Sequence, residues 1–294
     1  MTQKGQSLLY HFENTRGEQH MDNRPIGFFD SGLGGLTSIP YLMESLPDEK
    51  IIYFGDTART PYGSKAIRTI RNFSFEIADF LVKSNVKMIV IACNTVSSTC
   101  VDDLQKRFPD IPIVSIIEPA AREVALTCTP ENQVGIIGTK VTIASHAYQN
   151  TVSKYNADLT IHENACPAFA PLIEEDIINN DIMDLTIKYY MDDFVRANNL
   201  DTVILGCTHY PLIKKNIERI YPHLNIINPS SIVVKRIAEI LEERDMFAEN
   251  SDFNNVFYAS DLSENFLRMI DHIFEDKDDD AKVKFLNFDL EGEH

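Results

Sequence analysis

Short β-branched segments alternate with longer amphipathic segments along most of the chain, and this alternation restricts the fold more than any other feature. The short segments, which we predict to be strands, start at residue 26 and recur at 51–54, 88–92, 113–117, 134–137, 159–163, 203–205, 226–227 and 255–260. Between them lie patterns such as residues 67–84, in which apolar residues recur at three- and four-residue steps and share one helix face. A chain that repeats strand and helix in this way builds parallel sheets covered by helices, so we predict an α/β fold.

Two of the predicted strands end in similar sequences. Residues 87–95 read KMIVIACNT and residues 201–209 read DTVILGCTH, so each has an apolar strand, a small residue, a cysteine and a polar pair. Ligands of parallel α/β folds bind beyond the carboxyl ends of the strands. The two segments therefore predict two similar lobes, with Cys93 and Cys207 at the tips of central strands and facing one cleft.

A pair of thiols on opposite sides of a cleft suits the inversion of an amino-acid α-carbon. One group removes a proton from one face of the carbon, and a second group returns a proton to the other face. Cysteine can do both, because its ordinary pKa of about 8.5 lies close to working pH and falls beside a cation or a helix N-terminus. Cys100, Cys128 and Cys166 lack this setting, and we interpret them as structural.

The composition excludes several classes of partner. A formal net charge of −17 repels phosphate backbones and anionic lipids, so neither nucleic acid nor a membrane is expected as a partner. No apolar stretch approaches the roughly 20 residues that span a bilayer, and the N-terminus lacks the apolar core of a signal peptide. The five cysteines have neither disulfide nor zinc spacing. We therefore expect a cytoplasmic protein with reduced thiols and no metal.

Both ends of the chain are expected to lie outside the fold. Residues 1–24 are predicted to be a leader, and because Met21 resembles a natural start, residues 1–20 are interpreted as translated leader or cloning remnant. Residues 271–294 form an acidic tail, which is typical of a solvated segment.

Four motifs, in this order, carry a resemblance to the glutamate racemase family: DSGLGGLT at residues 30–37, PYG at 61–63, ACNT at 92–95 and GCTHYP at 206–211. The resemblance implies two α/β lobes around a buried cleft, no cofactor, glutamate as the substrate and supply of D-glutamate for peptidoglycan synthesis. It implies a first lobe from residues 25–118 plus 230–270 and a second from 119–229. Family members dimerise in more than one arrangement, so a homodimer is compatible with the sequence but not specified by it.

The glycine segment after the first predicted strand also invites a nucleotide-binding interpretation. That interpretation fails, because a dinucleotide fingerprint needs glycine at position 37, where this chain has threonine, and the P-loop lysine is missing. What remains is a tight turn that opens a helix, whose free N–H groups suit a carboxylate. The resemblance places Asp30 beside the first thiol and the substrate ammonium, with Ser31 in contact with the substrate; a simple helix cap is the alternative for Asp30.

The resemblance also implies the other site residues. His209 follows Cys207 by two residues, so both side chains project to one side of an extended segment, and the family pattern makes His209 the assistant of that thiol. Glu174 matches a second assistant more loosely, with Glu175 next to it. The remaining implied substrate-binding residues are Tyr62, Gly63, Asn94, Thr95, Thr139 and Thr208.

By resemblance, Cys93 removes the proton from D-glutamate and Cys207 removes it from L-glutamate. A carbanion next to a carboxylate is hard to form without an electron sink, so positioning and a closed, water-poor cleft have to lower the barrier. Other functions stay open: a racemase of aspartate or another acidic amino acid, a pyridoxal enzyme, a thiol hydrolase, or a non-catalytic binding protein on the same fold.

Overall fold

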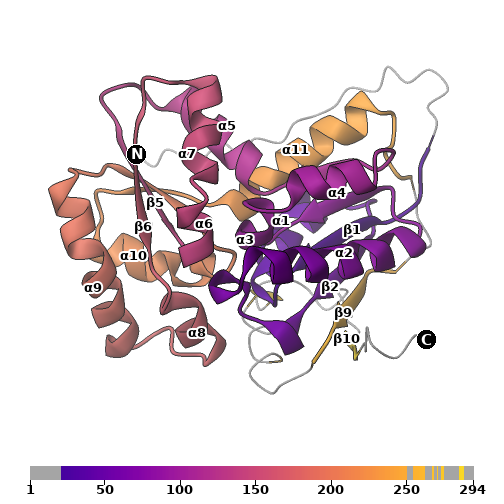
Figure 1. Cartoon of the computed structure of the whole chain (residues 1–294), viewed down its shortest axis with the longest axis horizontal. Coiled ribbons are helices and arrows are strands. Elements are labelled where there is room, and N and C mark those ends of the chain that lie inside the picture. Colours follow the sequence, from indigo (N-terminus) through magenta and orange to yellow (C-terminus); the bar gives the residue numbers. More distant parts are fainter. Residues whose placement is uncertain are drawn as a thin grey trace, which may run out of the picture.

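Two parallel sheets form the centre of the molecule, and each is covered by helices (Figure 1). A computed structural model describes residues 21–249, 254–261, 267, 270, 273–274 and 285–287. Every strand pair in both sheets is parallel, as predicted from the alternation of strands and helices. Residues 1–20 of the leader predicted for residues 1–24, and most of the predicted acidic tail, lie outside the described residues, whereas residues 21–24 are described.

The larger sheet has the strand order β10-β9-β2-β1-β3-β4. Its strands are β1 (Ile26–Asp30), β2 (Ile51–Gly55), β3 (Met88–Ile91), β4 (Ile113–Ser115), β9 (Val256–Ala259) and β10 (Phe285–Asn287). The strands β1, β2 and β3 are buried along their whole length, which is the pattern of a parallel sheet covered on both faces.

The smaller sheet has the order β6-β5-β7-β8. Its strands are β5 (Gln133–Gly138), β6 (Thr160–Ala165), β7 (Thr202–Gly206) and β8 (Asn225–Ile227). The thiol-bearing segments follow β3 and β7, and both of these strands have a neighbour on each side. The predicted likeness of the two segments therefore extends to their places in the two sheets.

Helices connect the strands in both halves of the molecule, one half being built on the larger sheet and the other on the smaller sheet. Those between strands of the larger sheet, with the helix α11 that returns to it, are α1 (Ile39–Ser45), α2 (Ile67–Lys83), α3 (Asn94–Ser97), α4 (Val101–Arg107) and α11 (Pro229–Glu243). The others are α5 (Ile117–Thr127), α6 (Lys140–Ala144), α7 (Ala147–Tyr155), α8 (Phe169–Glu174), α9 (Asp181–Ala197) and α10 (Lys214–Ile220). Short 3-10 turns occur at η1 (Gly34–Ser38), η2 (Thr57–Arg59), η3 (Tyr62–Ser64) and η4 (Tyr210–Ile213).

The helix boundaries follow local chemistry. The apolar stripe predicted for residues 67–84 forms α2, which buries Ile70, Ile77 and Leu81. The return helix α11 starts at Pro229, because a proline at the first helical position needs no N–H partner and the Asn228 side chain accepts the Ser230 N–H at 3.1 Å. α11 then packs against α1 and α5 and so connects the two halves.

Two segments differ from the predicted strands. The strand predicted for residues 113–117 ends at Ser115, because the Ser115 hydroxyl accepts the Ile117 N–H at 3.1 Å where α5 begins. The strand β10 (Phe285–Asn287) lies in the stretch predicted to be an acidic tail and pairs with β9. Three residues, Phe-Leu-Asn, are too few to show the period of a strand among the charged residues around them, so the sequence did not predict β10.

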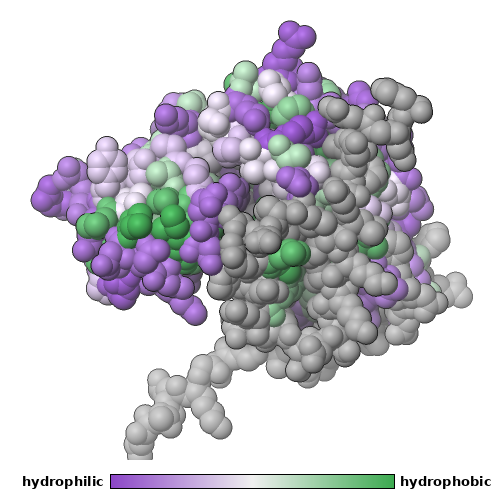
Figure 2. Space-filling view, turned by 90° about the horizontal axis from the view of Figure 1, so that it is seen from below, coloured by the Kyte–Doolittle hydropathy of each residue, from purple (hydrophilic) through white to green (hydrophobic). Residues whose placement is uncertain are grey.

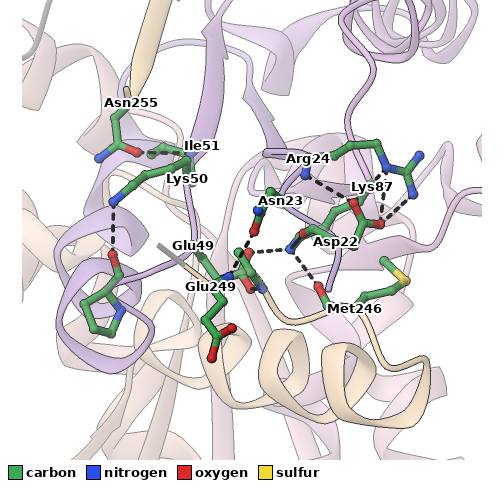
Figure 3. A network of polar contacts seen from close by, with 12 residues as sticks. Asp22, Asn23, Arg24, Glu49, Lys50, Ile51, Lys87, Met246, Glu249 and Asn255 are labelled. Carbon is green, nitrogen blue, oxygen red and sulfur yellow. Dashed lines mark hydrogen bonds and ion pairs between the residues drawn. The ribbon is translucent and has the colours of Figure 1, made fainter. Parts of the chain in front are cut away.

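A buried ion pair between Lys87 and Glu49 lies at the amino ends of strands in the larger sheet (Figure 3). The Lys87 Nζ lies 2.6 Å from Glu49 Oε2 and donates to the main-chain oxygens of Asp22 and Met246, each at 2.7 Å. The Glu49 Oε1 accepts the Ala248 N–H at 2.8 Å. This cluster ties the segment before β1 and the segment after α11 to the strands.

The described part of the surface in Figure 2 is mostly hydrophilic, with hydrophobic side chains gathered at the left, the end of the molecule where α8 and α9 lie. On α9, Ile182, Leu185 and Tyr189 are exposed large hydrophobic residues. Among the described residues no helix combines the length and the apolar character that a bilayer span requires.

Candidate active site

The two cysteines lie directly beyond the carboxyl ends of corresponding strands. Cys93 follows β3 and begins α3, whereas Cys207 follows β7. Both are nearly inaccessible, with 3% and 6% of their surface exposed. The helices α3 and α6 meet at the junction of the two halves (Figure 1), so this edge of the first sheet faces the second.

The surroundings of Cys93 favour a neutral thiol. Its Sγ lies 3.4 Å from the Ser31 Oγ, and Asp30 is close enough to act on it electrostatically. Burial, followed by the negative charge of Asp30, raises the pKa of Cys93 well above its ordinary value. Deprotonation of this thiol therefore requires a nearby positive charge, such as the ammonium group of an amino acid.

Asp30 joins the two thiol regions. This fully buried carboxylate accepts N–H bonds from Gly32 and Gly35 at 3.2 Å through Oδ2, and its Oδ1 accepts the Thr208 hydroxyl at 3.3 Å. Burial raises the pKa of Asp30, although His209 and the hydrogen bonds oppose that effect. Because Thr208 directly follows Cys207, one carboxylate contacts the surroundings of both cysteines.

Cys207 begins a chain of polar contacts. Its Sγ lies 3.8 Å from His209 Nδ1, the His209 Nε2 lies 3.1 Å from Glu174 Oε1, and the Thr60 hydroxyl donates to the same oxygen at 3.2 Å. Burial opposes the charged imidazole, but the contacts with Cys207 and Glu174 outweigh it and raise the pKa of His209 well above its ordinary value. Burial likewise opposes the Glu174 carboxylate, yet His209 lowers its pKa. The arrangement places an imidazolium between a carboxylate and a sulfur.

Two glycines allow the halves to approach closely. A Cβ at Gly34 would lie 2.4 Å from the Thr208 Oγ1, and a Cβ at Gly63 would lie 2.5 Å from the Thr139 Cβ. At these distances any other residue would force the two halves apart. The glycines of the first and second predicted motifs therefore serve contact with the second half.

Hydroxyl groups line the same junction. The Thr95 Oγ1 lies 3.0 Å from the Thr139 Oγ1, which in turn lies 3.0 Å from the Thr142 Oγ1. Thr139 also accepts the Thr142 N–H at 3.2 Å and so caps α6. The structure thus brings Thr95 and Thr139, which the sequence could not relate to each other, into direct contact.

Tyr62 is buried, but its hydroxyl does not point to the thiols. It donates instead to Asp56, which also accepts Arg59 Nε at 2.7 Å and the Ser260 hydroxyl at 2.9 Å. The predicted substrate contact of Tyr62 and Gly63 stays a prediction, and it would have to use their main-chain N–H groups. Among the described residues no group of three or more His, Cys, Asp or Glu side chains is arranged to hold a metal ion.

The sequence missed several residues around the site. Thr60 stands beside the predicted PYG motif, which was a usable signal. Tyr148 on α7, whose hydroxyl donates to the Asn94 Oδ1 at 2.6 Å, carried no such signal. Thr37 contacts the Ser230 hydroxyl at 2.8 Å across a sequence separation that no local pattern reveals.

Comparison with known proteins identifies a family for the chain. The family model described as Asp/Glu/Hydantoin racemase matches residues 40–237. The chain belongs to this racemase family.

Other members of the family resemble the chain over most of its length. It is 46% identical to a glutamate racemase of Sulfurihydrogenibium sp. over 217 residues, which cover 74% of this chain and 82% of the relative. It is 39% identical to one of Hydrogenobaculum sp., with 89% and 96% of the two chains covered. The solved glutamate racemase of Francisella tularensis in complex with D-glutamate superposes with a TM-score of 0.82 at 36% identity, covering 92% of this chain and 98% of that racemase.

Proposed function

We propose that the protein interconverts L- and D-glutamate without a cofactor, with Cys93 and Cys207 as the two acid–base groups. The observation that carries this proposal is the burial of both thiols beyond corresponding strands of two sheets, with Asp30 in contact with the surroundings of each. The relatives named glutamate racemase, and the solved relative with D-glutamate, support glutamate as the substrate.

The reaction moves one proton off the α-carbon and another onto it. With L-glutamate, the Cys207 thiolate takes the α-proton and becomes a thiol, and the electron pair of the C–H bond stays on the α-carbon and its carboxylate. The Cys93 thiol then donates its proton to the opposite face and becomes a thiolate. D-Glutamate reacts by the same steps in reverse, so charge and protons balance in both directions.

The neighbouring side chains supply the charges that these steps need. The imidazolium of His209, 3.8 Å from Cys207 Sγ, stabilises negative charge on that sulfur, and Glu174 holds the imidazole in place. Asp30 lies beside Cys93 and can hold the substrate ammonium there. The closed setting strengthens these interactions, because little water reaches the thiols.

The product fits one role in the cell. D-Glutamate supplies peptidoglycan synthesis, which is the role that the family implies, and we place the reaction in the cytoplasm. The five free cysteines are compatible with that compartment. A homodimer stays a prediction, and sedimentation at several protein concentrations tests it.

Proton NMR of L- and D-glutamate in D₂O tests the proposal, with circular dichroism recorded on the same samples. We expect the wild type to exchange the α-proton and to racemise both enantiomers without an added cofactor. Cys93→Ser and Cys207→Ser should each lower racemisation by about a thousandfold or more, because serine is a far weaker acid.

Three outcomes would overturn the proposal. If glutamate keeps its α-proton while aspartate loses it, the protein is an aspartate racemase. If neither acid reacts, the cleft binds a ligand without this chemistry. A Cys93→Ser variant that cleaves a thioester or amide through Cys207 would point to a hydrolase.

A further inference from the structure

At the start of α3, the side-chain oxygen of Asn94 accepts a hydrogen bond, whereas its NH₂ group has no partner among the described residues. The residue is 2% exposed, and its Oδ1 accepts the Tyr148 hydroxyl at 2.6 Å. Its Nδ2 is buried and has no hydrogen-bond partner among the described residues. A buried donor left in this state costs about 1–3 kcal/mol, so an acceptor that reaches it gains that amount.

The orientation of the amide follows from the hydrogen-bond inventory of the two groups. If the amide were turned over, Nδ2 would donate to the Tyr148 oxygen, and the phenolic proton and the Asn94 Oδ1 would both lack a partner. As the structure stands, only the NH₂ group lacks one. The arrangement with a single unsatisfied group is favoured.

The surroundings of Tyr148 keep its hydroxyl protonated, so that it can donate a hydrogen bond. It is 1% exposed on α7, in the second half of the molecule, and its ring is held in the main hydrophobic core. Burial, followed by the negative charge of Cys207, raises the pKa of Tyr148 well above its ordinary value, so the hydroxyl keeps its proton over the working pH range. Tyr148 lies next to the Cys207 segment, because a Cβ at Gly206 would be 3.4 Å from the Tyr148 ring, whereas Asn94 directly follows Cys93.

We propose that Tyr148 is a positioning residue, whose hydroxyl holds the Asn94 carboxamide so that its NH₂ group donates to a carboxylate of the substrate between the two thiols. The proposal rests on the proposed function for the identity of the substrate. The bond also joins α7 in one half of the molecule to the start of α3 in the other, so the orientation of the donor depends on how the two halves pack together. Tyr148 thereby couples the packing of the two halves to recognition of an acidic amino acid.

Tyr148→Phe tests this coupling, because it removes only the hydroxyl and keeps the ring that fills the core. We expect KM for glutamate to rise about tenfold with a much smaller change in kcat, since the lost contact is made to the bound substrate before and during the reaction. Tyr221→Phe is a matched control: the Tyr221 hydroxyl also donates at 2.6 Å to a side-chain oxygen, that of Asp192 on α9, and neither residue is one of the predicted site residues. A general loss of stability would lower the melting temperature of either variant without raising KM.

Two further variants separate a role through Asn94 from a role of Tyr148 by itself. In an Asn94→Ala background, Tyr148→Phe should raise KM by less than about twofold, because the group it positions is already gone. Asn94→Asp keeps an acceptor for Tyr148 but replaces the donor with a negative charge, and it should weaken binding by more than Asn94→Ala does. If Tyr148→Phe raises KM by the same factor in the wild type and in the Asn94→Ala background, the two residues act independently and the proposal is wrong.

Calorimetric titration with glutamate gives a readout that does not depend on turnover. Tyr148→Phe should raise Kd by about the same factor as KM. If the wild type racemises glutamate and Tyr148→Phe keeps its Kd and KM, the positioning role is wrong and the proposed function stands. If the wild type binds glutamate without racemising it, the proposed function is wrong, and the change in Kd still decides the positioning role. If the wild type neither binds nor racemises glutamate, both are wrong.

Discussion

Cys93 and Cys207 occupy equivalent places beyond β3 and β7, but their surroundings differ. Cys93 lies against Ser31 and beside the buried Asp30, and burial together with that negative charge raises its pKa. Cys207 lies beside His209, which Glu174 holds and keeps cationic. The fold repeats the position of the thiol without repeating its electrostatics.

The difference shows how one protein can hold a thiol and a thiolate at the same pH. The free protein is expected to keep the proton on Cys93, whose pKa is raised, while the imidazolium of His209 faces the Cys207 sulfur. Because the two enantiomers have the same free energy, kcat/KM is equal in the two directions whatever the surroundings. The asymmetry can therefore appear only in the separate values of kcat and KM for L- and D-glutamate.

Among the residues around the thiols, the largest effect is expected from Asp30→Asn, which removes the charge on the Cys93 side. The asparagine carbonyl can still accept the N–H groups of Gly32 and Gly35, and its NH₂ can donate to Thr208, so the geometry is kept. We expect kcat/KM to fall about a hundredfold in both directions, measured by circular dichroism with each enantiomer. A fall of less than threefold would mean that Asp30 only supports the turn.

His209→Asn removes the cation from the Cys207 side and should lower kcat/KM about tenfold. The wild-type rate should fall as the pH rises through the raised pKa of His209, because the imidazolium is lost there. The variant should lack that alkaline fall, which a pH series of kcat measures. If the variant keeps the same alkaline fall, another group controls the charge of Cys207.

Alkylation compares the two sulfurs directly, because the thiolate is the nucleophile. Under limiting iodoacetamide, we expect Cys207 to react about tenfold faster than Cys93, whose pKa is raised by burial and by Asp30. Mass spectrometry of tryptic peptides measures both sites, with the buried Cys166 as the internal reference. Equal rates would show that the two thiols share their charge evenly.

The smallest effect is expected from Glu174→Gln, through stability. The folded-state pKa of His209 is raised, so its contribution is complete below the unfolded pKa and is lost as the pH rises through the folded one. The folded-state pKa of Glu174 is lowered, so its contribution is present above the unfolded pKa and is lost as the pH falls through the folded one. Glu174→Gln should therefore lower the free energy of unfolding by about 1 kcal/mol near pH 6, and by less at both extremes, in denaturant titrations. A difference that does not vary with pH would contradict the ion pair.

The sequence predicted those features that follow from local pattern. Alternating strands and helices predicted the α/β fold, and the matching ends of β3 and β7 predicted where both thiols lie. Contacts between distant segments could not be predicted in this way, because no period or spacing relates Asn94 to Tyr148 or Thr60 to Glu174. The short strand β10 was also missed, since its pairing with β9 depends on the sheet that is already formed. The roles of the site residues and the division into lobes stay predictions.

The unequal thiols have a consequence for repeated turnover. A molecule that has converted L-glutamate releases its product with the proton on Cys207 and the charge on Cys93, which is the less favourable arrangement. The free protein therefore carries a chemical record of the enantiomer that it last released. At high substrate concentration, we expect turnover in this direction to be limited by the proton exchange with solvent that restores the thiol at Cys93. The isotope content of the product should then depend on which enantiomer the same molecule released before.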